Sequence, residues 1–270
     1  MNGSMADRPA YTADLSLVMP CYNEEEVILF TIPRLMKAFD EAGYNLEIVA
    51  VDNGSNDRTA EVIAELASEH PGVVPSRVET NIGYGFGVIT GLPAATAPWV
   101  GMIPADGQVD AEDVVRLYEA AQATNGNVIA KVRRRFRMDG LTRKIISIFY
   151  NGLVWVLWPG MRSLDVNGNP RIMKRDVMQA LKLESTDFLI DPELLIKARH
   201  MGVRILEMNV FARMRGSGLS HVRASTCWDF FSSLLAFRFT GRLSAWKKGL
   251  AAGEPDNSAS PTIGSTADAG

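Results

Sequence analysis

The strongest constraint on the fold is a regular alternation of short apolar runs with amphipathic segments. Apolar runs at Leu15–Pro20, Leu46–Val51 and Trp99–Ile103 have the length of buried strands, and a polar turn follows each of them. Segments with a 3.6-residue apolar period come next, the first of them behind an Asn23 cap and the acids Glu24–Glu26. Such alternation is typical of a doubly wound, mostly parallel α/β sheet flanked by helices.

The remaining elements follow from the same patterns. Further strands are expected at Val73–Val78, Asn127–Val132 and Val203–Met208. Helices are expected from the Asn23 cap to Gly43, from Thr59 to His70, and at Gly85–Ala95, Asp110–Ala123, Leu141–Trp158, Met173–Leu181 and Pro192–His200.

Composition excludes several protein classes. With 270 residues, 47% of them hydrophobic and 22% charged, the chain can bury a core without a disulfide or a structural metal. Its two cysteines, Cys21 and Cys227, are far apart in the sequence and predict buried thiols in a reducing compartment. Residues 1–14 lack the apolar core of a secretory signal, so a cytoplasmic location is expected.

Charge is concentrated in one segment. The formal net charge of −3 gives no reason to expect a nucleic-acid partner. Lys131–Lys144, however, carries seven basic residues and one acid. We expect this segment to bind an anion, to lie against anionic lipid headgroups, or to do both.

Two segments suggest a membrane surface. Ile145–Met161 is free of charge for 17 residues, which is shorter than the roughly 20 that a spanning helix needs. Residues 226–250 interleave aromatic and basic side chains, a composition typical of peripheral contact. We therefore divide the chain into an N-terminal extension (1–14), an α/β domain (15–225), an amphipathic membrane-surface segment (226–250) and a disordered tail (251–270).

Carboxylates follow the predicted strands. Asp52 ends the second strand and Asp106 follows Trp99–Ile103. Ligands of doubly wound sheets bind at this edge. Asp106 and Gln108 offer one charged and one neutral oxygen, enough to assist Mg²⁺ or Mn²⁺ that keeps water and phosphate as further ligands. An isolated Asp-Gly pair is equally typical of a turn, so the choice between a metal site and a turn depends on the order of the motifs along the chain.

Eight motifs follow one another over residues 15 to 220. They are Pro20-x-Tyr22-Asn23-Glu24, Asp52-Asn53-Gly54-Ser55, Asn81-x-Gly83-Tyr84-Gly85, Ala105-Asp106-Gly107-Gln108, Arg143-Lys144-x-x-Ser147, Asp165-x-x-Gly168-x-x-Arg171, Asp191-x-Glu193, and Glu207-Met-Asn-Val210 with Arg215-x-x-Gly218. This series resembles the inverting glycosyltransferases of the GT-A fold, family-two type. Within them it is most similar to the dolichyl- and polyprenyl-phosphate sugar synthases.

The resemblance implies a donor site with a divalent metal. The implied nucleotide-binding residues are Pro20, Tyr22, Glu24, Asp52, Gly83 and Ala105. The implied metal ligands are Asp106 and Gln108, for Mg²⁺ or Mn²⁺. Pro104 stands where the family has a first aspartate, and proline has no side-chain ligand. Either the donor diphosphate completes the metal site, which we favour, or the chain binds without catalysis.

The resemblance also implies an acceptor site. Its implied phosphate-binding residues are Arg133, Arg143, Ser147 and Arg215, and its implied catalytic residues are Asp106, Asp165 and Arg143. Which of Arg133, Arg134 and Arg135 points inward stays open. A phosphate monoester is already ionised near neutral pH, so its attack on a sugar requires cations more than a strong base. Asp191 and Glu193 are interpreted first as helix-capping residues.

The expected function is inverting transfer of a sugar from a GDP- or UDP-linked donor to a polyprenyl or dolichyl phosphate. The enzyme is expected at the cytoplasmic face of a membrane, in peripheral contact with it. One alternative is a glycosyltransferase for a soluble hydroxyl acceptor, with Asp165 or Asp191 as base. Another alternative is a nucleotide-sugar binder that has lost turnover.

Overall fold

The computed structural model describes residues 11–124, 126–136, 141–161, 163–211 and 224–252. Its strands are β1 (Leu15–Cys21), β2 (Leu46–Asn53), β3 (Val73–Val78), β4 (Trp99–Met102), β5 (Val128–Phe136), β6 (Arg171–Lys174) and β7 (Arg204–Phe211). Its α-helices are α1 (Glu25–Glu41), α2 (Thr59–Glu69), α3 (Tyr84–Gly91), α4 (Ala111–Gln122), α5 (Leu141–Leu157), α6 (Arg175–Leu181), α7 (Ile190–His200), α8 (Ala224–Phe239) and α9 (Arg242–Ala252). A 3-10 turn, Leu92–Ala94, follows α3.

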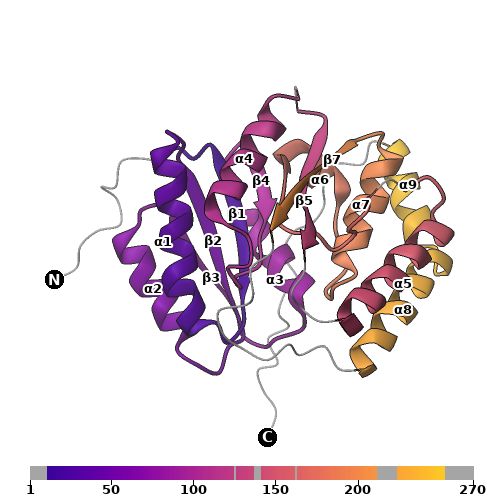
Figure 1. The fold of residues 1–270 in the computed structure, drawn as a ribbon, viewed down its shortest axis with the longest axis horizontal. Helices are drawn as coiled ribbons and strands as arrows, with labels where there is room; N and C mark the ends of the chain where they lie inside the picture. Colours follow the sequence, from indigo (N-terminus) through magenta and orange to yellow (C-terminus); the bar gives the residue numbers. More distant parts are fainter. Residues whose placement is uncertain (1–10, 125, 137–140, 162, 212–223, 253–270) are drawn as a thin grey trace, which may run out of the picture.

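The strands form one sheet in the order β3-β2-β1-β4-β6-β5-β7 (Figure 1). The pairs of β1 with β2 and β4, of β2 with β3, and of β5 with β7 are parallel. Strand β6 alone among these runs antiparallel, between β4 and β5. The doubly wound, mostly parallel sheet predicted from the alternation is therefore confirmed.

The prediction of a helix from Met173 is wrong at its start. Met173 lies in β6, where it pairs with Val100 of β4 and with Ile129 of β5. A four-residue strand carries too little sequence pattern to be recognised by itself. Pairing on both sides stabilises it, and the helical period begins only at Arg175.

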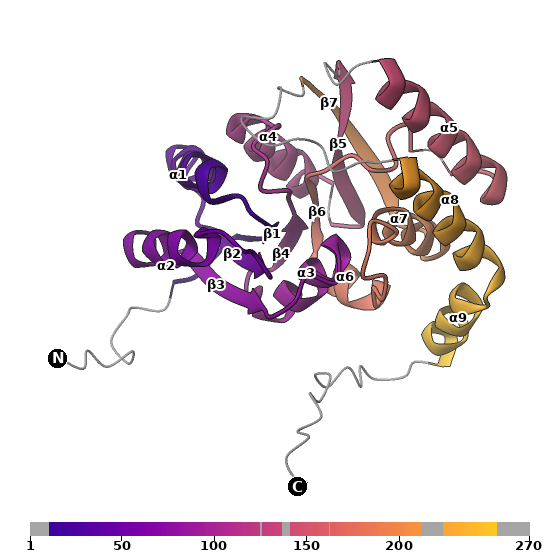
Figure 2. The ribbon, with the colours of Figure 1, turned by 90° about the horizontal axis from the view of Figure 1, so that it is seen from below.

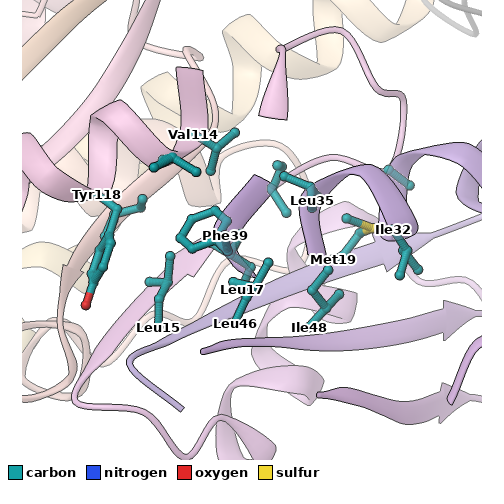
Figure 3. Close-up of a cluster of buried hydrophobic side chains, with 14 of the residues drawn as sticks. Leu15, Leu17, Met19, Ile32, Leu35, Phe39, Leu46, Ile48, Val114 and Tyr118 are labelled. Atoms are coloured by element: carbon teal, nitrogen blue, oxygen red, sulfur yellow. The ribbon is translucent and has the colours of Figure 1, made fainter. Parts of the chain in front are cut away.

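Strand alternation builds a core on each face of the sheet. Leu15, Leu17 and Met19 of β1 pack against α1, α2 and α4, whereas Val18 points to the opposite face. Figure 3 shows the first cluster, in which Phe39 lies beside Leu17. The Cys21 thiol is buried in the same cluster, and burial raises its pKa, so the buried thiol predicted at this position is confirmed. The side chain of Cys227 lies outside the described residues.

Helices α8 and α9 pack onto the core on the face of the sheet to which Val18 points. Residues 226–250 fall largely within α8 and α9, and Leu234, Phe237, Leu243 and Trp246 of these helices are buried. Figure 2 shows α8 running beside α5. Part of this amphipathic segment therefore belongs to the core of the domain. Within the described residues we find no helix with the length and hydropathy needed to cross a bilayer.

Candidate active site

Two loops at the carboxyl edge of the sheet are joined by hydrogen bonds between backbone and side chains. The Asn23 backbone N–H donates to Ser55 Oγ (3.0 Å), and Asn23 Oδ1 accepts from the Asn56 backbone (2.9 Å). The Glu24 backbone donates to Thr59 Oγ1 (2.9 Å). Asn23 was expected to cap α1. It instead adopts φ 53° and links the loop after β1 to the loop after β2.

Buried oxygen atoms lie at the end of β2. Asp52 is 2% exposed, and its Oδ1 accepts from the Ser55 backbone at 3.0 Å. Its Oδ2 has no hydrogen-bond donor among the described residues, although Arg77 Nε lies 3.6 Å away. Asn53 donates to the Gly83 carbonyl (3.1 Å), while its Oδ1 has no donor in the same part of the chain. Buried acceptors of this kind favour a ligand that brings hydrogen-bond donors.

Other residues expected at the nucleotide lie around these two loops. Pro20 is buried at the end of β1, Tyr22 is exposed beyond it, and Glu24 is half-buried at the start of α1. Ala105 is buried behind the loop that follows β4. Their placement at one edge agrees with a common pocket, but contacts to a nucleotide stay a prediction.

The glycines of the third motif allow α3 to approach another loop. Gly83 adopts φ 141°, and a Cβ atom at this position would lie 2.5 Å from the Thr186 carbonyl oxygen. The Phe86 backbone donates to that same carbonyl at 2.8 Å. Close packing therefore accounts for Gly83. It also fixes Tyr84, whose ring stacks on Phe188 with centroids 5.6 Å apart.

A small cleft brings the expected metal loop together with a basic side chain. The cleft has a volume of ≈ 30 Å³, and Asp106, Gln108, Arg134 and Asn169 line it together with Pro104. The Gln108 backbone donates to Asp106 Oδ1 at 3.2 Å. Asp106 and Arg134, 28 positions apart in sequence, therefore share one cleft.

The donor atoms of this loop fit a divalent cation that the substrate helps to bind. Asp106 supplies a carboxylate and Gln108 an amide oxygen, whereas Pro104 supplies no side-chain ligand. In the part of the chain that the structure describes, no three His, Cys, Asp or Glu residues gather into a metal site. Mg²⁺ commonly takes one or two carboxylates and completes its shell with water and phosphate oxygens. The residues fit that kind of site.

Arg134, which lines the cleft, is held by Asp165. Its Nε donates to Asp165 Oδ2 (3.0 Å), its second guanidinium nitrogen donates to Oδ1 (3.0 Å), and its backbone N–H also donates to Oδ2 (3.2 Å). Burial opposes the charge of Arg134, but the adjacent carboxylate prevails and holds its pKa above the ordinary value. Asp165 thus orients a charged guanidinium.

A buried lysine stabilises the segment that carries Asp165. Lys131 is fully buried, and its Nζ donates to Glu207 Oε1 (3.2 Å) and to the backbone carbonyl of Asp165. Glu207 also accepts from Ser163 Oγ (2.7 Å). Burial, with Arg171 nearby, lowers the pKa of Lys131 to about 8. The Lys131–Glu207 pair therefore ties the segment that carries Asp165 to β5 and β7.

Asp191 does not cap its helix as expected. Helix α7 starts two residues earlier than expected, at Ile190 with Leu189 as its N-cap, and the Asp191 side chain faces Arg171 Nη2 at 3.2 Å. Asn169 Nδ2 donates to both Asp191 oxygens, at 3.3 and 3.2 Å. Burial raises the pKa of Asp191, which Arg171 opposes. This pairing was not predicted, because an Asp before Pro at the start of a helical run is typical of a helix cap.

Glu193 is also misassigned as a capping residue. Its carboxylate forms an ion pair with Lys197 Nζ at 2.6 Å, and both side chains are buried. It accepts from the Ser185 backbone at 2.9 Å. Glu193 therefore stabilises the loop against which α3 packs.

The expected acceptor residues are placed only in part. Arg134 lines the cleft, and its strand neighbour Arg133 is not among the lining residues. Arg143 lies in the first turn of α5, but its side chain is outside the described residues. Ser147 lies about one turn later and is half-buried. Arg215 falls in 212–223, which is outside the described ranges.

Sequence reasoning missed Asn169 and Lys131 as parts of the site. Asn169 lies within the motif Asp165-x-x-Gly168-x-x-Arg171, so that motif pointed to the right segment. Lys131 appeared as one of seven basic residues. Its place in the apolar run of β5 was the available signal, because that strand is buried on both faces.

Comparison with known proteins identifies related chains. Residues 16–182 match the family model Glycosyl transferase family 2. An undecaprenyl-phosphate 4-deoxy-4-formamido-L-arabinose transferase of Pectobacterium atrosepticum is 34% identical over 142 residues, which cover 52% of this chain and 43% of that protein. A prophage bactoprenol glucosyl transferase homolog of Escherichia coli K12 is 34% identical, over 63% of this chain and 55% of that protein.

A third relative matches over more of its length. An uncharacterised glycosyltransferase of Mycobacterium bovis is 33% identical over 215 residues, covering 78% of this chain and 90% of that protein. The chain thus spans about half the length of the two lipid-phosphate relatives and nearly all of this one.

Solved structures confirm the fold. Glucosyl-3-phosphoglycerate synthase from Mycobacterium tuberculosis, in complex with Mn²⁺, UDP and phosphoglyceric acid, superposes with a TM-score of 0.66 at 19% identity. The match covers 86% of this chain and 84% of that chain. Together with the sheet order, it confirms the GT-A architecture expected from the sequence.

Proposed function

The chain belongs to glycosyl transferase family 2, and from this premise we propose that it moves a sugar from a nucleoside-diphosphate donor to a polyprenyl phosphate, with inversion. The observation that carries the proposal is the cleft shared by Asp106, Gln108 and Arg134. A carboxylate suited to a metal–diphosphate and a cation suited to a second phosphate lie on its walls. The names of the undecaprenyl-phosphate and bactoprenol relatives support a lipid-phosphate acceptor.

On the donor side, the two joined loops would hold the nucleotide. Asp52 Oδ2 and Asn53 Oδ1 are buried acceptors that suit hydroxyl or N–H groups of a nucleoside. The family resemblance supports further contacts to the nucleotide from Pro20, Tyr22, Glu24, Gly83 and Ala105.

The donor diphosphate would be bound at the loop after β4. Asp106 and Gln108 would hold Mg²⁺ or Mn²⁺, a proposal supported by solved relatives of the same fold that contain these ions. When bound, the cation supplies positive charge to the leaving diphosphate. Because Pro104 adds no ligand, binding of the cation would depend strongly on the diphosphate.

On the acceptor side, cations would draw a lipid phosphate toward the sugar. Arg134 is the cation whose position supports this role, and Arg143 and Ser147 on α5, with Arg133 and Arg215, are proposed from the family resemblance. The phosphate oxygen is already anionic and needs no strong base. Asp165 would therefore act by orienting Arg134, since both of its carboxylate oxygens accept from that guanidinium.

The surface of α5 suits contact with a membrane. Ile148, Phe149, Trp155 and Val156 are exposed large apolar side chains on this helix, which lies beside α8 (Figure 2). A lipid acceptor would reach the cleft most easily from such a surface. We propose peripheral contact at the cytoplasmic face of a membrane.

A donor and acceptor panel tests the proposal. UDP- and GDP-linked sugars are incubated with a short polyprenyl phosphate, with and without Mn²⁺ or Mg²⁺, and sugar-lipid and free nucleotide are quantified. We expect metal-dependent sugar-lipid formation by the intact chain and its loss in Asp106→Ala. Transfer to a soluble hydroxyl acceptor alone would reverse the choice of acceptor, and donor binding without any turnover would favour a catalytically silent binder.

A further inference from the structure

The hydroxyl of Tyr84 is buried at the start of α3 and has no hydrogen-bond partner in the described part of the chain. Burying a hydroxyl without a partner costs free energy, so such groups are rare unless a ligand or water satisfies them. The tyrosine ring itself is well fixed. Phe188 stacks on it almost in parallel, at an interplanar angle of 9°.

The backbone fixes the same residue from both sides. Gly83 and Gly85 flank Tyr84, and each packs so closely against residues 185–187 that a Cβ atom would clash. The hydroxyl therefore points in a direction set by packing. Burial raises the pKa of this hydroxyl, and the charge of Asp191 adds to the rise, against a smaller opposing effect of Arg171. It thus remains protonated and able to donate.

An unpaired acceptor lies beside Asp191, which follows by three residues the Phe188 that stacks on Tyr84. Asn169 uses its amide nitrogen on both oxygens of Asp191, which fixes the orientation of the amide. Its Oδ1 is buried without a donor among the described residues. Asn169 also lines the cleft with Asp106.

We propose that Tyr84 and Asn169 recognise a hydroxyl group of the sugar being transferred, and that Tyr84 thereby contributes to donor-sugar specificity. A sugar hydroxyl can accept from the Tyr84 O–H and donate to Asn169 Oδ1, which satisfies both unpaired groups. A fully ionised diphosphate oxygen can only accept, so it leaves Asn169 unsatisfied. This inference rests on the proposed function, because it assumes a nucleotide-sugar donor.

The test compares nucleotide sugars with their diphosphates by calorimetry. The intact chain and Tyr84→Phe are titrated in Mn²⁺ with UDP-glucose, GDP-mannose, UDP and GDP. For whichever sugar donor binds, we expect Tyr84→Phe to weaken its affinity about three- to tenfold, the size of one hydrogen bond, and to leave the affinity for the matching diphosphate unchanged. Without ligand, the variant should be at least as stable as the parent, because it loses an unpaired hydroxyl.

Tyr118→Phe is the matched control. Tyr118 is also a buried tyrosine, but its hydroxyl accepts from Gln122 (2.8 Å) and interacts with the Asp14 carbonyl, at the other end of β1. We expect it to lower stability and to leave the ratio of sugar-donor to diphosphate affinity unchanged.

Deoxygenated analogues of the best donor identify the hydroxyl. At one ring position, removal of the hydroxyl should weaken binding to the parent by more than Tyr84→Phe does, because the bonds to Tyr84 and to Asn169 are both lost. It should weaken binding to Tyr84→Phe by a smaller factor, because only the bond to Asn169 is left to lose. Equal losses for sugar donor and diphosphate, or no loss for either, would overturn the inference and leave the proposed function standing. Failure of the intact chain to bind any nucleotide sugar would overturn both.

Discussion

Arg134 and Asp165 form a two-point ion pair whose two nitrogen–oxygen distances are both 3.0 Å, and Arg134 lines the same cleft as Asp106. Both side chains are largely buried. A carboxylate that binds a guanidinium through both oxygens fixes the plane of that guanidinium as well as its position. Asp165 therefore determines the position and orientation of the Arg134 charge in the cleft.

Asp165→Ala should lower both stability and acceptor use. It leaves the Arg134 charge uncompensated, so the free energy of unfolding should fall by about 3 kcal/mol in urea titrations. The KM for polyprenyl phosphate should rise while calorimetric affinity for the donor is retained. The double variant Arg134→Met with Asp165→Leu should regain stability without regaining acceptor use. Recovery of activity in that double variant would contradict the role given to Arg134.

Restoring a carboxylate at Pro104 should strengthen metal binding. Pro104→Asp adds a formal negative charge next to Asp106, and we expect the Mn²⁺ concentration for half-maximal activity to fall roughly tenfold. Asp106→Asn should raise it. Pro104→Asn, which has a similar size and no charge, is the control. If it has the same effect as Pro104→Asp, the loop conformation rather than the charge limits metal binding.

The stability of the protein should rise with pH through the titration of Lys131. Its pKa of about 8 in the folded chain lies below the 10.5 of an ordinary lysine, so the unfolded state binds the proton more tightly. This unfavourable contribution is complete below pH 8 and disappears as pH rises toward 10.5. Between pH 7 and 9.5, the parent should gain about 2 kcal/mol of unfolding free energy relative to Lys131→Met. Parallel pH curves for the two proteins in urea titrations would show that Lys131 keeps an ordinary pKa.

Two exposed phenylalanines separate membrane contact from general surface hydrophobicity. Phe149 on α5 is 68% exposed and Phe30 on α1 is 65% exposed. Phe149→Ser should reduce partition onto anionic liposomes several-fold in sedimentation assays, because it removes an apolar side chain from the proposed contact surface. Phe30→Ser should leave partition unchanged, and neither should change unfolding by more than about 0.5 kcal/mol. An equal loss in both would argue against α5 as the contact surface.

The sequence predicts the donor half of the molecule better than the acceptor half. Strands β1 to β4 alternate with their helices, Asp52 lies at the end of β2 and Asp106 in the loop after β4, so their shared edge could be inferred. The family resemblance, carried by motifs in this region, is confirmed. Beyond β5 the alternation ends.

The cationic half depends on contacts between distant segments. Arg134 pairs with Asp165 across 31 positions of the sequence, and Asp191 pairs with Arg171 across 20 positions. Neither pairing has a local pattern, so three adjacent arginines could not be told apart and Asp191 was assigned to a cap. The side chain of Arg143 and the placement of Arg215 remain predictions.

The reversed direction of β6 determines on which side of their strand the residues proposed for each substrate lie in the sequence. In β1, β2 and β4 the chain leaves the sheet at the edge proposed as the active site, so the residues proposed for the donor lie at the ends of these strands or after them. At β6 the chain enters the sheet from that edge, so Asp165 and Asn169 come before theirs. We therefore infer that insertions in the connection ahead of β6 can change the surroundings proposed for the sugar and the lipid phosphate while the loops after β1, β2 and β4 keep their lengths.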